Sequence, residues 1–308
     1  FKIVDEYDII MLTKNIKGDR VMILRIIFAV SVGVVFGSIC GLIFKMLNKR
    51  VKKPVPDESR IDILRRYSDY ESQQEIQKHS MKMVLNRPAP EILDKYNYRS
   101  YRAADLENKD ALVFSMLDFV CDNFSHTGDA VLQSDHSITG VIKSCEKNGL
   151  KTNCRGLSII LAEALRMNGI KARIVTCKPY EEPFVDCHVV VDCLMPSGTR
   201  IMLDPTYRLY LTNDNGKYIS LAKLREGIIA GRTFHHNVKA SYNGVDFNYH
   251  DYIEYMTKNV FRFNTNYNQD DTDSVFSEIE LVPKGYTTKG YSKVIQFTTD
   301  RDYFWGMG

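Results

Sequence analysis

Residues 153–178 read NCRGLSIILAEALRMNGIKARIVTCK, and the elements predicted from them set the fold class. Residues 157–167 carry apolar side chains at helical spacing, and Asn168-Gly169 is a typical helix C-terminus. Residues 170–177 are rich in β-branched side chains. The pattern predicts a helix that is followed at once by a strand, with Cys154 just before the helix.

The next residues predict two more strands joined by a tight turn. We expect these strands at 187–194 (CHVVVDCL) and at 199–203 (TRIML). The sequence Met195-Pro196-Ser197-Gly198 between them is typical of a turn, and Asp204-Pro205 ends the last strand. The three strands are therefore expected to form one antiparallel sheet.

The flanking sequence completes the prediction of the fold class. Helices are expected at 106–124, 138–146 and 220–230, and the remainder to about residue 300 is expected to alternate short β-like runs with polar loops. Helices first and antiparallel strands later predict an α+β domain.

Composition excludes several classes of protein. Of the 308 residues, 44% are hydrophobic, which excludes overall disorder. A net charge of +3 is too small to indicate nucleic-acid binding. The 7 cysteines form no C-x-x-C pair, so we expect free thiols rather than a disulfide scaffold or a zinc ribbon.

A separate apolar stretch precedes this domain. Residues 26–44 read IIFAVSVGVVFGSICGLIF and contain no charge. About 19 such residues approach the length that crosses a hydrocarbon core of roughly 30 Å, so one transmembrane helix is expected over 26–47, with a buried core helix as the alternative. The expected parts are an N-terminal flank (1–25), the membrane helix (26–47), a linker with a helical lead-in (48–105) and the main domain (106–308).

The sequence around this span also bears on orientation and assembly. Basic residues flank the span on both sides and lean only slightly towards a cytoplasmic C-terminal side. Gly33, Gly37 and Gly41 fall four apart on one helix face, which indicates a possible self-association contact.

Cys154, His188 and Asp204 are the candidate catalytic residues. A thiol at a helix N-terminus feels the positive end of the dipole, which favours thiolate, and the free N–H groups there can stabilise an oxyanion. A turn centred near Pro196-Ser197 places His188 opposite a residue within one or two positions of Asp204. An Asp there can orient the imidazole, and a Cys on the helix completes a nucleophile, base and orienting acid.

Three segments within 153–208 resemble the transglutaminase-like superfamily. They are the Cys followed by a helix ending in GIKAR, the strand His-Val-Val-Val, and Leu-Asp-Pro-Thr. The stretches DNGKYISLAKLREGIIAGR (214–232) and TTDRDYFW (298–305) are similar to a bacterial, membrane- or envelope-associated branch. Thr152 stands where many members have Gly, and Val189 where many have Ala, which leaves the substrate open.

The resemblance implies a papain-like core, in which a helix bearing Cys154 packs on an antiparallel sheet bearing His188 and Asp204. It implies a nucleophile, a general acid/base and an orienting acid, in that order, acting on amide bonds of peptides or proteins through an acyl-enzyme. Water as acceptor gives a peptidase or amidase, which we favour, and an amine gives a protein-glutamine acyltransferase. No metal or organic cofactor is implied. The resemblance favours a single-pass membrane protein with an extracytoplasmic domain.

Other residues are candidates for the same site. Asn153, Arg155, Tyr207 and Trp305 are expected to line a substrate cleft, and His126, with Asp129 nearby, is a candidate second site residue. Two alternatives stay open: an idle fold that serves as an envelope binding or scaffold module, and a structural membrane protein with buried thiols. The last predicts that Cys154 is no more reactive than Cys121 or Cys145.

Overall fold

The structure of the protein is a computed structural model that describes residues 59–71, 82–103, 108–266, 268–269, 278–288 and 296–306. The described residues all belong to one compact unit, Glu58–Gly308. The membrane helix expected over 26–47, with Gly33, Gly37 and Gly41, lies outside the described residues. In the part that is described, no helix combines the length and apolarity needed to span a bilayer.

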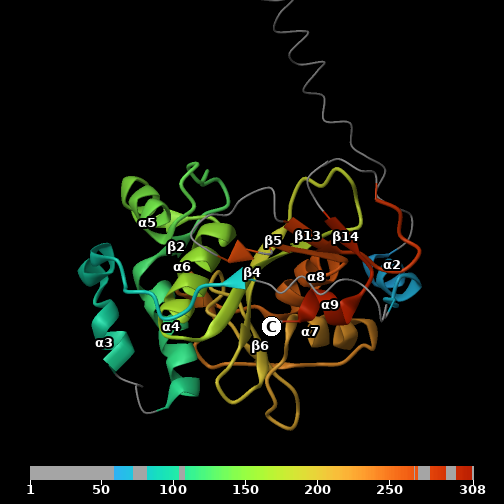
Figure 1. Cartoon of the computed structure of the whole chain (residues 1–308). Helices are drawn as coiled ribbons and strands as arrows, with labels where there is room; N and C mark the ends of the chain where they lie inside the picture. The colour runs from blue at the N-terminus through green and yellow to red at the C-terminus, as the bar shows by residue number, and fades with distance from the viewer. Residues whose placement is uncertain are drawn as a thin grey trace, which may run out of the picture. The chain divides into compact units, whose positions relative to one another are not determined.

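A six-stranded sheet forms the centre of the domain (Figure 1). Its strand order is β14-β13-β11-β4-β5-β6. Every neighbouring pair is antiparallel except β13–β14, which is parallel. The strands are β4 (Lys171–Lys178), β5 (His188–Leu194), β6 (Arg200–Leu203), β11 (Arg262–Asn266), β13 (Glu278–Leu281) and β14 (Gln296–Thr298).

Helices cover both faces of this sheet (Figure 1). One layer holds α4 (Lys109–Asn123), α5 (Ile138–Lys147) and α6 (Cys154–Met167). The other holds α2 (Arg60–Arg66), α7 (Leu221–Ile229), α8 (Tyr249–Asn259) and α9 (Arg301–Trp305). The described residues therefore form an α+β domain, as the sequence predicts.

The strands are apolar on both sides because each side meets its own core. In β5, Val189, Val191 and Cys193 face the core under α6, whereas Val190 faces the core under α7 and α8. Side chains alternate along a strand with a period of two, so a near-continuous apolar run is what a sheet covered on both faces requires.

Several short elements complete the fold. A 3-10 helix (Glu91–Tyr96) and α3 (Tyr98–Ala103) precede α4. Four two-stranded pairings lie outside the main sheet. They are β1 (Lys82–Met83) with β12 (Asn268–Gln269), β2 (Ser125–His126) with β3 (Lys151–Thr152), β7 (Leu211–Thr212) with β8 (His235–His236), and β9 (Ser241–Tyr242) with β10 (Val245–Asp246).

The elements predicted between residues 106 and 230 are confirmed within a few residues, but the prediction for the remainder was wrong in part. That region contains the helix α8, in place of the loops and short β-like runs alone that the sequence predicts. Asn248 caps α8 by accepting from the N–H of Asp251 at 3.3 Å. Tyr252 and Met256, one helical turn apart, bury its inner face. This pattern is sparse among polar residues, which hides it in the sequence.

Candidate active site

The N-terminus of α6 presents Cys154 as its first residue. Asn153 caps the helix: its Oδ1 accepts from the N–H of Gly156 at 3.0 Å, and its Nδ2 donates to the carbonyl of Ala130 at 2.9 Å. A Cβ on Gly156 would lie 2.1 Å from Oγ1 of Thr152, so only glycine fits beside that threonine. Thr152 is thus matched to Gly156 in this chain.

His188 and Asp204 form the second part of the site. Nε2 of His188 lies 2.7 Å from Oδ2 of Asp204, and both side chains are buried. The ladder between β5 and β6 pairs Val191 with Leu203, so its continuation sets Val190 opposite Asp204. His188 therefore lies two positions from direct opposition and meets the carboxylate along the diagonal, within the register that the sequence predicts.

Asp204 is held by two further donors. Its Oδ1 accepts from the backbone N–H of Thr206 at 3.0 Å, and its Oδ2 accepts from the hydroxyl of Tyr252 at 3.0 Å. Burial and the charge of Asp204 raise the pKa of Tyr252 well above 10.0, so this hydroxyl keeps its hydrogen. Sequence reasoning missed Tyr252 because it did not predict α8.

The charges around the thiol favour its ionised form. Burial raises the pKa of Cys154, but hydrogen bonds from His126 and His188, the charge of His188 and the N–H of Val189 together lower it to about 6. Burial lowers the pKa of His188, but the charge and hydrogen bond of Asp204 and the contact with Cys154 raise it above its ordinary value. The two shifts favour a thiolate–imidazolium pair near neutral pH.

The other thiols that the structure describes have raised pKa values. Burial raises the pKa of Cys145 and of Cys187 to about 11. Burial also raises the pKa of Cys121, Cys177 and Cys193. Among the described cysteines, Cys154 alone has a lowered pKa.

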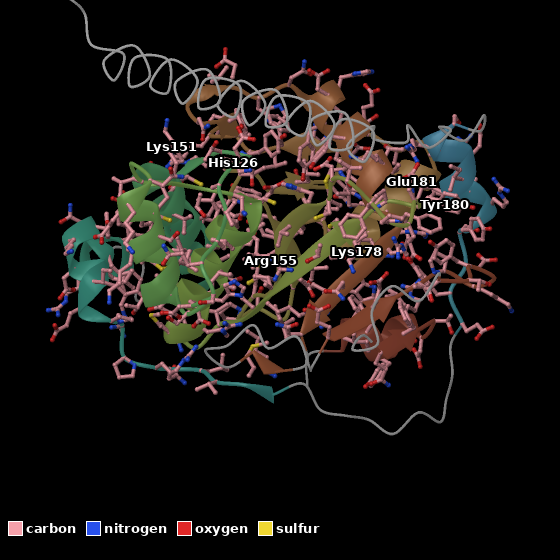
Figure 2. The ribbon with its side chains drawn as sticks, turned by 90° about the horizontal axis from the view of Figure 1, so that it is seen from above. His126, Lys151, Arg155, Lys178, Tyr180 and Glu181 are labelled. Atoms are coloured by element: carbon pink, nitrogen blue, oxygen red, sulfur yellow. The ribbon has the colours of Figure 1, made fainter. Side chains whose placement is uncertain are left out.

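His126 is brought to the same thiol. The strands β2 and β3 run parallel and pair His126 with Thr152, close before Cys154 in the chain. Figure 2 shows His126 beside Lys151, as this pairing requires. Asp129, expected to accompany it, instead lines a polar cavity of about 320 Å³ together with Lys147 and Lys151.

Aromatic side chains surround the imidazole of His188. The ring of Tyr207 lies 6.0 Å from that of His188, and the ring of Tyr255 lies 5.4 Å from it. Tyr207 is a predicted cleft residue. Tyr255 was missed because it lies on α8, which the sequence did not predict.

The remaining predicted cleft residues lie in different places. Arg155 directs its Nη2 to Oγ1 of Thr176 on β4, 3.2 Å away. Trp305 packs on Phe263 at 5.2 Å between ring centroids and lies beneath the guanidinium of Arg173. Trp305 thus packs against the core under α7 and α8, whereas Cys154 packs against the core under α6.

The loop between β4 and β5 leads directly into His188 and is anchored at several points. Arg60 of α2 forms an ion pair with Glu181, and the hydroxyl of Tyr286 donates to the carbonyl of Tyr180 at 3.0 Å. Figure 2 shows Tyr180 and Glu181 beside the blue ribbon of α2. This anchoring fixes the direction from which the chain enters the site.

Comparison with known proteins finds a family match over part of the chain. Residues 99–205 match the family model described as the Transglutaminase-like superfamily. No curated protein matches the chain.

Similar solved structures include a proposed cysteine protease from Cytophaga hutchinsonii, with 13% identity over 56% of this chain and 65% of that chain and a TM-score of 0.27. A protein described as a TGase shares 12% identity over 56% of this chain and 37% of that chain, with a TM-score of 0.27. A proposed protease from Parabacteroides distasonis shares 15% identity over 42% of this chain and 29% of that chain, with a TM-score of 0.25.

The chain spans less than two thirds of the length of each of these structures. Residues 99–205, the segment that matches this family model, hold Cys154, His188 and Asp204.

Proposed function

We propose that the protein is a cysteine acyl-transfer enzyme in which Cys154 is the nucleophile, His188 the general acid/base and Asp204 the orienting acid. One observation carries the proposal. His188 binds buried Asp204 through Nε2 at 2.7 Å, which leaves Nδ1 for the Cys154 thiol at the N-terminus of α6. A carboxylate, an imidazole and a thiol in this order are the components of a nucleophilic site.

The chemistry then takes two steps. The Cys154 thiolate attacks the carbonyl carbon of an amide, a C–S bond forms, and the carbonyl electron pair moves to oxygen. When the oxyanion collapses, the C–N bond breaks and His188 gives its Nδ1 proton to the leaving amine. Water, deprotonated by His188, then attacks the thioester and releases the acid and the thiolate; an amine at this step gives transamidation instead.

The backbone at the head of α6 supports the oxyanion. The first N–H groups of a helix have no intrahelical acceptor, and the cap from Asn153 goes to Gly156. The N–H of Cys154, at the first helical position, is therefore available beside the attacked carbonyl.

A peptide or protein is the proposed substrate. Val185, on the loop that leads into His188, is 90% exposed, and Val131, on the loop that binds Asn153, is 86% exposed. Exposed apolar side chains on loops at a nucleophile suit a chain with apolar side chains of its own. Anchoring through residues 26–47, with the domain outside the cytoplasm of a bacterial cell, completes the proposal and rests on the sequence alone.

Acylation of Cys154 tests this function. The full chain is incubated with p-nitrophenyl acetate, p-nitrophenolate release is followed, and the acetylated peptide is mapped by mass spectrometry after an acid quench. Acetylation of Cys154, absent in Cys154→Ala and retained in the matched control Cys121→Ala, is expected. Release that is unchanged in Cys154→Ala contradicts the proposal and favours an idle, scaffold-type fold.

A further inference from the structure

His126 occupies a position that the proposed reaction does not yet use. Two bonds tie its segment to the head of α6: Thr127 donates its N–H to the carbonyl of Thr152 at 2.8 Å, and Asn153 donates Nδ2 to the carbonyl of Ala130 at 2.9 Å. These two bonds and the pairing of His126 with Thr152 bring His126 beside the start of α6, where a hydrogen bond from its side chain lowers the pKa of the Cys154 thiol.

A distant hairpin holds His126 in place. Oδ1 of Asn243 accepts from the N–H of His126 at 2.8 Å, and Nδ2 of Asn243 donates to its carbonyl at 3.0 Å. Asn243 and Gly244 have φ of 50° and 81°, the left-handed conformation of a tight hairpin turn between β9 and β10. The side chain of Asn243 therefore binds both the backbone N–H and the carbonyl of His126.

The same hairpin supplies a partner for one nitrogen of the imidazole. The hydroxyl of Tyr242 lies 3.0 Å from Nδ1 of His126, and the two rings meet edge to face at 5.6 Å. When the phenol donates to Nδ1, the imidazole carries its hydrogen on Nε2, which is then the nitrogen left for the bond to Cys154. The side-chain partner at Nδ1 is a phenol, in contrast to the carboxylate that binds His188.

We infer that His126 is a second catalytic imidazole, which donates its Nε2 hydrogen first to the Cys154 thiolate and then to the oxyanion that forms on the attacked carbonyl. The inference rests on the proposed function. During attack the negative charge moves from sulfur to the carbonyl oxygen, and a donor beside the sulfur can follow it. His188 is not free for this role because its proton passes to the leaving amine. His126 and the N–H of Cys154 thus form a pair of donors.

Two reactions of the same sulfur separate this role from a structural one. Acetylation by p-nitrophenyl acetate forms an oxyanion, whereas alkylation by iodoacetamide at pH 9 needs only the thiolate. His126→Phe, which keeps a ring and removes the donor, is compared in the full chain with His126→Gln, which restores an N–H. His250→Phe, at an exposed histidine of α8, is the matched control.

The inference predicts that His126→Phe lowers kcat for acetylation on the order of 10²–10³-fold, the effect of removing one oxyanion donor. KM and the alkylation rate at pH 9 stay close to those of the wild type, and His126→Gln recovers about tenfold or more of kcat. Tyr242→Phe, which keeps the ring contact and frees Nδ1, is expected to lower kcat less than His126→Phe does.

Two results overturn the inference while leaving the proposed function intact. One is a wild-type kcat in His126→Phe. The other is a parallel loss of acetylation and of alkylation at pH 9 in both His126→Phe and Tyr242→Phe, because that pattern means a disordered site and not a missing donor. A wild-type protein that does not acetylate Cys154 contradicts the proposed function itself.

Discussion

Tyr252 and His188 bind the same oxygen of Asp204: the hydroxyl of Tyr252 lies 3.0 Å from Oδ2, and Nε2 of His188 lies 2.7 Å from it. All three side chains are buried. One carboxylate oxygen thus joins the helix α8 to the strand that carries the imidazole. Tyr252 is a candidate positioning residue, since its hydroxyl reaches the imidazole through Asp204.

Tyr252→Phe tests this link. The substitution removes a hydrogen bond to a charged acceptor, so we expect the free energy of unfolding to fall by about 1.5–3 kcal/mol. We also expect a lower kcat for acetylation and little change in KM, because the carboxylate loses one of the groups that fix its position. Urea denaturation and p-nitrophenolate release measure the two effects. Wild-type stability together with wild-type kcat contradicts the assignment.

The close contact between Gly156 and Thr152 gives a second prediction. Gly156→Ala places a Cβ where Oγ1 of Thr152 lies, and overpacking of this kind costs about 1–3 kcal/mol. Thr152→Ala in the same chain should recover part of the loss, because it removes the atom in conflict. Gly128→Ala, with nothing within 4 Å of the added atom, is the control. Additive effects of the two substitutions count against the contact.

The pH dependence of acetylation follows from the shifted pKa values. The pair reacts as thiolate and imidazolium, so the rate should rise as the pH passes the lowered pKa of Cys154, about 6, and fall as the pH passes the raised pKa of His188, about 10. Asp204→Asn removes the charge that raises the pKa of His188, so the alkaline limb should move to lower pH. A profile of kcat/KM against pH for both proteins checks this, and an unmoved alkaline limb contradicts it.

The same two pKa shifts make the stability of the fold depend on pH. The raised pKa of His188 contributes stability that is fully present below pH 6.5 and is lost as the pH rises through the folded value. The lowered pKa of Cys154 contributes stability above pH 9.0 that is lost as the pH falls towards about 6. The two groups change the unfolding free energy with pH in opposite directions. In Cys154→Ala only the contribution of His188 remains, so the unfolding free energy should fall as the pH rises. Unfolding free energies measured from pH 6 to pH 10 check this.

Trp305 gives a prediction about binding. Its ring packs on Phe263 and on Arg173 rather than beside Cys154, so Trp305→Ala should lower the unfolding free energy by about 1–3 kcal/mol. The KM for acetylation should not change, and Trp305→Phe should keep most of the stability. A raised KM in Trp305→Phe contradicts this prediction and indicates that Trp305 contacts the substrate.

The sequence predicts those parts of the site whose signals are local. Cys154 precedes a clearly patterned helix, and His188 and Asp204 flank one tight hairpin, so short-range periodicity brings the three together. The partners of His126 lie 116 and 117 residues away, on a hairpin that Asn243-Gly244 marks locally but whose contact with His126 no local pattern specifies. Tyr252 lies on α8, where only a few apolar residues mark the buried face. No sequence pattern next to Trp305 predicts whether its ring packs in the core under α6 or in the core under α7 and α8.

The reactivity of the Cys154 thiol shows whether the thiolate–imidazole pair exists. The rate of alkylation by iodoacetamide is measured for each cysteine from pH 5 to pH 10, in the wild type and in His188→Ala. We expect Cys154 to react fastest, to stay reactive down to about pH 6, and to lose this advantage in His188→Ala. If Cys154 reacts no faster than Cys121 or Cys187 and the substitution changes nothing, the thiolate–imidazole pair does not exist and the account is wrong.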